Sequence, residues 1–273
     1  MKGKLARFSI LAAVVAAFFA AAAGAQEVAF RDPTGDDNGP GKYTYPTDAV
    51  YKPGSFDLTQ LKVKKSGANV DFEVSVNSAL DDPWRMGVGF AVQMIFIFVK
   101  TGDAKPSYTQ GLPGLNIQFA PEDAWNRCVI LSPQPSSRVK AEVDAKAPSM
   151  KAEILVPVRT KGSGKTISGS VSVKDFPSGD PSTWGYQVIM QSNEGFPAKT
   201  DLLTRKVNEY EGQHRFGGGN DGDCDPHVMD ILAGSGNGDA SEVDLQHKML
   251  AYECNPDGTA KQLATLRMVY RKK

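Results

Sequence analysis

The chain has 273 residues, of which 31 are basic and 31 acidic, so its formal net charge is zero. A near-neutral surface argues against nucleic acid or anionic lipid as the main partner, because both are recognised through concentrated positive charge. The length suits one large all-β domain, so we expect a single domain after the N-terminal segment.

Residues 1–25 have the pattern of a secretory signal peptide. Lys2, Lys4 and Arg7 precede an apolar run at 10–23, and small residues follow at 23–25. The run is too short and too rich in alanine for a permanent span, and no later segment is suited to cross a membrane. Cleavage would leave Gln26 as the first residue, with 28 basic and 31 acidic residues remaining. We expect residues 26–273 to be exported to the periplasm or cell surface.

The first acidic loop, residues 32–41, follows directly. Asp32, Asp36, Asp37 and Asn38 place four oxygen-bearing side chains within seven positions, with Gly and Pro residues bending the backbone between them. Calcium takes six to eight oxygen ligands in proteins, and clustered carboxylates repel one another without a cation between them. The loop therefore predicts a structural Ca²⁺ site, the alternative being an exposed turn.

Strand patterns outnumber helix patterns in the rest of the chain. Apolar and polar residues alternate at 70–76 and, less regularly, at 154–158 and 266–270. Residues 94–99 are apolar throughout, which predicts a central strand covered on both faces. Further strands are expected at 127–131, 167–173 and 184–190, and a short helix within 241–252.

These elements predict an all-β fold, with two antiparallel sheets packed as an immunoglobulin-like or jelly-roll-like sandwich and few short helices. We expect the last strand, near Met268, to complete a sheet that begins near Phe56.

The second acidic loop, residues 217–226, is rich in glycine and carries Asp221, Asp223 and Asp225 at alternate positions. This spacing imitates the start of a helix-loop-helix calcium loop. The pattern then fails, because Pro226 stands where glycine is required and Leu232 where the bidentate Glu belongs. A different oxygen-rich cation site and a plain turn both remain open.

Five blocks of the sequence resemble a known family. They are 32–41 (DPTGDDNGPG), Tyr43 with 45–47 (YPT), 54–58 (GSFDL), 215–219 (RFGGG) and 225–232 (DPHVMDIL). Together they resemble the C-terminal module of glucodextranase, whose relatives are the DOMON and family-nine carbohydrate-binding sandwiches. The resemblance spans nearly all of the mature chain. It implies an exported, calcium-associated β-sandwich that binds carbohydrate or a cell-surface polymer.

Aromatic side chains are the candidate sugar platforms, because sugars stack on aromatic faces. Trp84 has a loop-like setting after Asp81-Asp82-Pro83, and Trp125, Tyr43 and Tyr45 are further candidates. The alternative is that these rings belong to the core, as we expect for Trp184.

A haem group is the alternative ligand, since some DOMON relatives hold haem between a Met and a His or Lys. The candidate ligands are Met86, Met94, Met190 and Met229, with His214 or His227.

Three cysteines leave one unpaired after any disulfide. Cys224 and Cys254 form the favoured pair because both lie in Gly/Asp/Asn-rich loops, whereas Cys128 lies in a strand-like segment.

Catalytic motifs are missing from the sequence. It has no Gly-x-Ser-x-Gly or His-Glu-x-x-His motif, and a phosphate-binding loop at Gly164-Lys165-Thr166 would need glycine where Arg159 stands. We therefore expect a non-catalytic binding module. The alternatives are a haem-carrying periplasmic electron-transfer module and an envelope domain that docks onto another protein.

Overall fold

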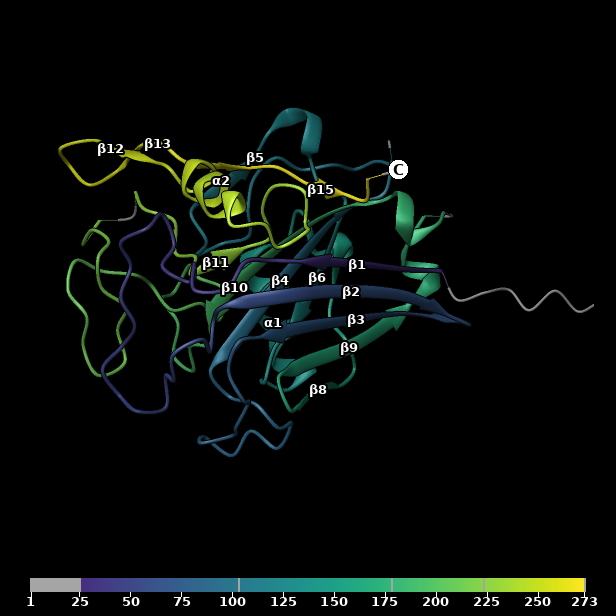
Figure 1. Cartoon of the computed structure of the whole chain (residues 1–273), viewed down its shortest axis with the longest axis horizontal. Coiled ribbons are helices and arrows are strands. Elements are labelled where there is room, and N and C mark those ends of the chain that lie inside the picture. Colours follow the sequence, from purple (N-terminus) through teal and green to yellow (C-terminus); the bar gives the residue numbers. More distant parts are fainter. Residues whose placement is uncertain (1–25, 103, 178, 223, 273) are drawn as a thin grey trace, which may run out of the picture.

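The computed structural model describes residues 26–102, 104–177, 179–222 and 224–272, so the expected signal peptide lies outside the described residues. Two β-sheets lie face to face in it (Figure 1). The first sheet has the order β1 (Glu27–Arg31), β2 (Leu58–Ser66), β3 (Asn69–Val76), β9 (Thr166–Ser172) and β8 (Thr160–Ser163). Neighbouring strands are antiparallel, and every second residue of β3 points into the core.

The second sheet has the order β11 (Asp230–Ile231), β10 (Gly185–Ser192), β4 (Gln93–Lys100), β6 (Arg127–Leu131) and β7 (Ile154–Leu155). β15 (Val269–Tyr270) also pairs with β10. All these pairings are antiparallel except that of β6 with β7. The two layers form the predicted all-β sandwich.

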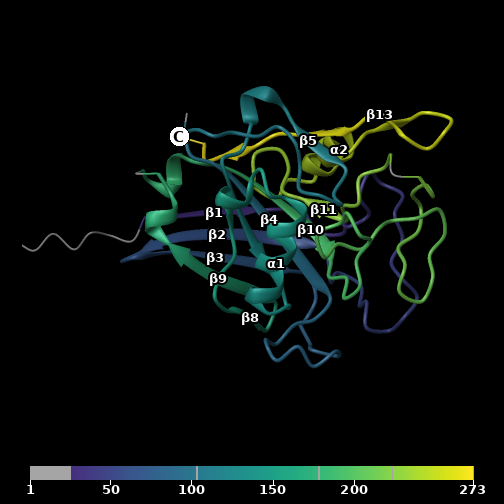
Figure 2. The same cartoon turned by 180° about the vertical axis from the view of Figure 1, so that it is seen from behind.

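β4 is covered on both faces, as its unbroken apolar sequence predicted. Ile95, Ile97 and Val99 belong to the core between the sheets. Met94, Phe96 and Phe98 belong to a second core on the outer face of the second sheet. That face is covered by α1 (Ser136–Lys146), whose Val139 and Val143 are buried against it (Figure 2).

The remaining elements lie around the sandwich. β5 (Ile117–Phe119) pairs in parallel with β14 (Ala264–Leu266), and β12 (Glu253–Cys254) forms a hairpin with β13 (Ala260–Gln262). α2 (Ser241–Met249) confirms the expected short helix. Single 3₁₀ turns occur at Pro121–Asp123, Lys151–Glu153, Val173–Asp175 and Pro181–Thr183.

Two expectations about strands are wrong. Residues 266–270 do not form one strand, because Arg267 and Met268 separate β14 from β15, and β15 joins the second sheet through β10 instead of the sheet near Phe56. Residues 154–158 are paired only at Ile154–Leu155, because Pro157 has no N–H with which to continue the pairing. Trp184, by contrast, is stacked on Phe176 in the core, as expected.

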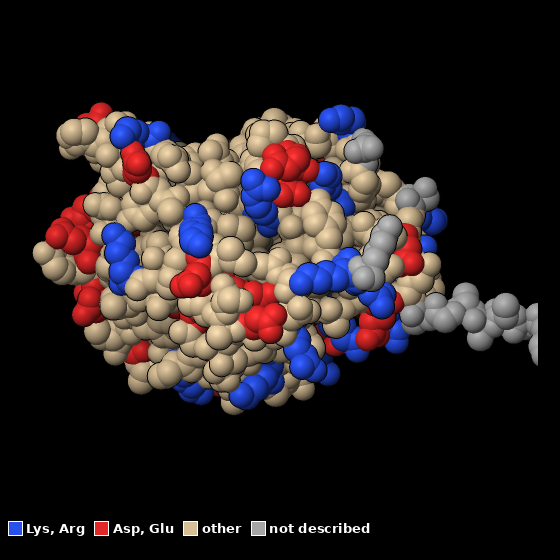
Figure 3. Space-filling view, turned by 45° about the horizontal axis from the view of Figure 1, so that its top comes forward, with Lys and Arg blue, Asp and Glu red and all other residues tan. Residues whose placement is uncertain are grey.

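Positive and negative side chains are interspersed on the face shown in Figure 3, without a large area of one sign. This agrees with the balanced composition. Among the described residues, no helix combines the length and apolar character needed to span a membrane.

Candidate metal centre and ligand pocket

Four aspartates from three segments of the chain converge beside the edge strand β11. Asp32 follows β1, Asp36 lies four residues later, Asp57 precedes β2, and Asp230 begins β11. Carboxylate oxygens of Asp32, Asp36 and Asp230 all lie within 4.8 Å of one another. None of the four residues is more than 5% exposed. We call these four residues the acidic cluster.

Gly39 explains how the first acidic loop folds inward. Its φ of 60° lies in the left-handed region, and its N–H donates to the carbonyl of Met229 at 2.8 Å. A Cβ atom at this position would lie 2.3 Å from the ring of Tyr43. Glycine thus allows the loop to lie directly against the segment that leads into β11, which brings Asp36 beside Asp230.

Backbone N–H groups hold two of the carboxylates in place. Asp230 accepts hydrogen bonds from Leu58 N at 2.7 Å and from Ile231 N at 2.8 Å. Asp32 Oδ1 accepts one from Ala233 N at 3.3 Å. These bonds join the starts of β2 and β11 to the acidic cluster.

Asp57 is oriented in the same way. Its Oδ2 accepts from Gly35 N at 2.8 Å and from Asn77 Nδ2 at 3.1 Å. Four other oxygens of the acidic cluster are buried without a hydrogen-bond partner: Asp32 Oδ2, both carboxylate oxygens of Asp36, and Asp57 Oδ1. Buried oxygens without partners are costly, so their grouping is a strong sign of a ligand.

The electrostatics of the acidic cluster favour either bound protons or a positive partner. Burial, reinforced by the charge of Asp57, raises the pKa of Asp36 to about 7, and burial raises the pKa of Asp57 to about 6. Burial and neighbouring carboxylates raise the pKa of Asp32 and Asp230 well above the usual range. Within the described part of the chain, no ion pair with Lys or Arg is recorded for any of the four. The donors are all oxygens, which suits a hard cation such as Ca²⁺ rather than a soft metal.

Helix α2 is hydrogen-bonded to the segments that carry the acidic cluster. Gln246 is fully buried, and its side chain donates to the carbonyl of Asp36 and accepts from Ile231 N at 3.1 Å. Glu242 is 2% exposed and accepts hydrogen bonds from the loop that precedes the helix. Its donors are Ser235 N and Oγ at 2.7 Å each, Gly238 N at 2.9 Å, Asp239 N at 3.2 Å and Asn237 N at 3.4 Å.

Glu242→Gln is expected to destabilise the protein, because it removes the charge that these five donors share. We expect a loss of ~2 kcal/mol in the free energy of unfolding, as for hydrogen bonds to a charged group. Denaturant unfolding measures it. Asp244→Asn is the matched control, since Asp244 lies in the same first turn of α2 but is exposed. Equal losses in the two variants would mean that Glu242 acts only through the helix dipole.

Asp37 and Asn38, the other two predicted ligands, are directed elsewhere. Asp37 Oδ2 accepts a hydrogen bond from the hydroxyl of Tyr45, and Asn38 Oδ1 lies 3.4 Å from His247 Nε2. The structure therefore brings together Asp32 and Asp36 of the predicted set, and it adds Asp57 and Asp230. One signal for Asp230 was available in the sequence, because it is a lone carboxylate within the otherwise apolar run at 228–232.

The second acidic loop has a different arrangement. Asp223 lies outside the described residues, and Asp221 is exposed, with its Oδ1 accepting from Glu209 N at 3.4 Å. Asp225 is buried and accepts from Asn220 N at 3.2 Å. Where the chain is described, Asp32, Asp36 and Asp230 form the only group of three metal-binding side chains close enough to share an ion.

A disulfide joins the second acidic loop to β12. Cys224 and Cys254 have an S–S distance of 2.08 Å and are 30 residues apart in sequence, and Cys128 is a buried free thiol.

Two of the four predicted sugar platforms, Trp125 and Tyr43, are buried and have no exposed aromatic face, which corrects that expectation for them. Trp125 is 0% exposed, and its indole N–H donates to Gln110 O at 2.8 Å. Tyr43 is buried and donates to Pro226 O at 2.9 Å. Tyr45 is half-buried, with its hydroxyl bonded to Asp37 and its ring packed edge-on against core phenylalanines. These rings support the interior and the base of the first acidic loop.

Trp84 lies at the surface instead. It is half-buried, packs edge-on against Tyr51 with ring centroids 6.1 Å apart, and lines a pocket of about 370 Å³. Phe196, which is 94% exposed, lines the same pocket. Sequence reasoning missed Phe196, although an aromatic residue within the turn-forming stretch 193–197 (NEGFP) was the available signal. We call this hollow the Trp84 pocket.

Polar groups also line the Trp84 pocket. Arg205 forms a salt bridge to Glu194 at 2.7 Å and lies over the ring of Tyr51, 5.9 Å from its centroid. His214 lines the pocket and packs against Tyr51 from another side, at 5.8 Å. Tyr51 follows the first acidic loop in the chain, so the segment that carries Asp32 and Asp36 leads directly to a residue that supports the pocket.

Most of the haem-ligand candidates are buried and do not line the Trp84 pocket. Met94, Met190, Met229 and His227 are buried, and Val207 N donates to His227 Nδ1 at 3.1 Å. Met86 and His214 line the Trp84 pocket together. His214 Nε2, however, lies 3.9 Å from Asp48 Oδ2, so that nitrogen is directed toward a carboxylate.

Comparison with known families gives one match. Residues 28–269 match the family described as the C-terminal binding module, SLH-like, of glucodextranase. No curated protein matches the chain. The family match confirms the resemblance predicted from the five sequence blocks and covers both sheets, the acidic cluster and the Trp84 pocket. The chain belongs to the family of C-terminal, SLH-like binding modules of glucodextranase.

Proposed function

We propose that the protein is an exported, non-catalytic module that binds carbohydrate or a cell-surface polymer and is stabilised by one structural Ca²⁺. The Trp84 pocket is the observation that carries the binding role. It combines two surface aromatic rings, Trp84 and Phe196, with the polar side chains of Arg205, Glu194 and His214. Aromatic faces beside fixed hydrogen-bonding groups are what recognition of a sugar in water requires.

The cation has a structural role in this proposal. Asp32, Asp36, Asp57 and Asp230 would supply the oxygen ligands, and four of their buried oxygens lack any other partner. The bound ion would hold the first acidic loop against the starts of β2 and β11. The loop in turn leads to Tyr51, on which Trp84 and Arg205 pack.

Export is supported by the sequence at 1–25 and by the disulfide between Cys224 and Cys254, since disulfides persist in oxidising compartments. The family is defined as a binding module, which supports the non-catalytic assignment. The periplasm and the outer surface both satisfy these observations.

Trp84→Ala is expected to weaken glycan binding at least about tenfold, which is ~1.4 kcal/mol of binding free energy. The reason is the loss of the larger aromatic face in the pocket. Binding is measured first on a glycan array and then by calorimetry with a glycan that wild type retains.

Tyr210→Ala is the matched control, because Tyr210 is 66% exposed but does not line the Trp84 pocket. Undiminished binding by Trp84→Ala, or an equal loss in Tyr210→Ala, would place the glycan elsewhere. If wild type binds no glycan but captures an envelope protein through this surface, the module is a protein-docking domain instead.

A haem-carrying electron-transfer module is the second candidate function. The observation in its favour is that Met86 and His214 line one pocket. A visible absorption spectrum of the purified protein, before and after incubation with haem, separates the two functions. A Soret band that shifts in Met86→Ala and His214→Ala would replace the carbohydrate proposal.

A further inference from the structure

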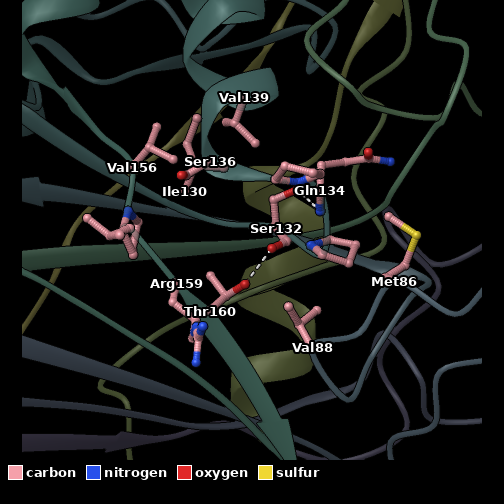
Figure 4. A pocket seen from close by; sticks show the side chains of 14 residues that line it. Met86, Val88, Ile130, Ser132, Gln134, Ser136, Val139, Val156, Arg159 and Thr160 are labelled. Atoms are coloured by element: carbon pink, nitrogen blue, oxygen red, sulfur yellow. Dashed lines mark hydrogen bonds between the residues drawn. The ribbon is translucent and has the colours of Figure 1, made fainter.

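A second hollow adjoins the Trp84 pocket. It has a volume of about 200 Å³ and lies among the segment after β6, the first turn of α1 and the residues that lead into β8 (Figure 4). Val156, Val158 and Arg159 line it on the side of β8, and Ser136 lines it on the side of α1. We call it the Arg159 hollow.

The two hollows share a wall. Met86 and Gln134 line both of them, and in Figure 4 these two side chains lie on the opposite side of the Arg159 hollow from Val156. The Arg159 hollow therefore lies directly beside the Trp84 pocket, with only Met86 and Gln134 common to both linings.

The shared wall is held firmly. Gln134 is only 8% exposed, donates to Asn193 Oδ1 at 3.1 Å and accepts from Arg138 Nη1 at 3.0 Å. On the other side, Asp82 accepts hydrogen bonds from Met86 N at 2.6 Å and from the next backbone N–H at 2.7 Å. The boundary between the two hollows is therefore fixed by hydrogen bonds in the folded structure.

The lining of the Arg159 hollow combines apolar surface with polar groups. Val158 is 86% exposed, and Val88 and Val156 extend the apolar surface. Arg159 is exposed, and Ser136 begins α1 at an end that no side chain caps. The hydroxyl proton of Thr160 is already used within the protein, because it is donated to Ser132 O at 2.6 Å. The free polar groups thus lie at the rim, where the hydroxyl or acidic substituents of a chain molecule would meet them.

Volume decides what kind of ligand the two hollows can take. Pockets for small ligands usually measure about 300–1,000 Å³. The Arg159 hollow is below this range and the Trp84 pocket is near its lower limit, at about 200 and 370 Å³. Neither is suited to enclose a large compact ligand, whereas consecutive units of a chain could occupy both.

We propose that the two neighbouring hollows form one extended groove that binds several consecutive units of a linear polysaccharide. One sugar unit lies against Trp84 and Phe196, and a unit farther along the same chain lies beside Val158 and Arg159. The inference rests on the proposed carbohydrate-binding function and adds that the module binds consecutive units of a chain and not a single free sugar.

Calorimetry with oligosaccharides of increasing length tests the groove. The probes are α-1,6-gluco-, β-1,4-gluco-, β-1,4-xylo- and α-1,4-galacturono-oligosaccharides, each from one to eight units. For the series that binds, wild type should gain at least about fivefold in affinity beyond the length that fills the Trp84 pocket, which is ~1 kcal/mol. Arg159→Ala and Ser136→Trp should remove this gain while leaving the affinity for the shortest bound oligomer unchanged.

Lys161→Ala is the matched control, since Lys161 is an exposed basic residue two positions from Arg159 that lines neither hollow. Far-ultraviolet circular dichroism checks that each variant is folded. If Ser136→Trp does not fold, Arg159→Ala still tests the groove, because it alters only an exposed side chain. Affinity that does not change with length, or an equal loss for short and long oligomers in Arg159→Ala, would overturn the groove.

Different results would contradict the proposed carbohydrate-binding function. If Trp84→Ala leaves the shortest oligomer bound as in wild type, the carbohydrate site lies elsewhere, whatever the length series shows. If wild type binds no member of the panel or of the array, both proposals are wrong.

Discussion

Chelation of the proposed Ca²⁺ is expected to lower the melting temperature of the protein by roughly 6–16 °C. An ion that binds only the folded state stabilises it by ~3–4 kcal/mol at a hundred to a thousand times its dissociation constant. The physical reason here is the acidic cluster, whose buried carboxylates repel one another without a cation. Calorimetric scans with EDTA, and then with Ca²⁺ in excess, measure the loss and its recovery.

The effect of chelation should grow with pH. Burial and neighbouring charge raise the pKa of Asp36 to about 7, and burial raises that of Asp57 to about 6, whereas an unfolded Asp titrates near ~4. Between about pH 4 and 7 the metal-free folded state therefore binds more protons than the unfolded state, so its stability falls as pH rises. The chelated protein should lose stability from pH 5 to pH 8, and the Ca²⁺-loaded protein should lose much less.

Asp36→Asn gives the sharpest check, because neither oxygen of Asp36 has another partner. At pH 8 the metal-free variant should be more stable than metal-free wild type, since one buried charge is gone, and it should respond weakly to Ca²⁺. Asp221→Asn is the control, because Asp221 is exposed and lies outside the acidic cluster. A wild-type protein with the same melting temperature in EDTA and in Ca²⁺ would eliminate the metal site.

The second large effect is expected from loss of the disulfide. Cys224→Ser with Cys254→Ser opens a loop of 30 residues. Chain-entropy arguments give ~3.5 kcal/mol for a loop of this length, which corresponds to a decrease in melting temperature of roughly 7–14 °C. The bond ties the second acidic loop to β12, and the double variant should lose protection from proteolysis in the 205–225 segment first.

Reduction of wild type provides the matched comparison for the disulfide. Dithiothreitol should lower the melting temperature of wild type to that of the double Ser variant and leave the variant unchanged, because Cys128 is buried and unpaired. Destabilisation of the double variant by the reductant would show that another bond is involved. Equal melting temperatures for wild type and variant would contradict the stabilising role.

Residue patterns along the chain were sufficient to predict most of the sandwich. The alternation at 70–76 predicted β3, because successive side chains on a strand point to opposite faces of the sheet. The unbroken apolar run at 94–99 predicted β4, because a strand covered on both faces has no solvent-exposed face. The pairing of the strands was harder to predict from the sequence. β15 pairs with β10, more than 80 residues earlier in the chain, and nothing in residues 266–270 specifies that neighbour.

The candidate site shows the same division. Asp32 and Asp36 were predicted because they crowd one short loop, whereas Asp57 and Asp230 reach the acidic cluster only when β2 and β11 are placed beside it. Asp37 and Asn38, although adjacent to Asp36, turn to Tyr45 and His247. Trp84 and Trp125 were equivalent candidates in the sequence, and packing leaves Trp84 partly exposed while it buries Trp125.

The sequence by itself determined the β class, the two-sided central strand, the oxygen-rich loop and the family, because each depends on residues that are close together along the chain or on blocks that can be recognised one at a time. Only the tertiary structure decided which carboxylates lie close together, which aromatic rings reach solvent, and that Met86 and Gln134 line two neighbouring hollows. Those properties depend on distances between residues far apart in the sequence, and such distances are set by the packing of the two sheets.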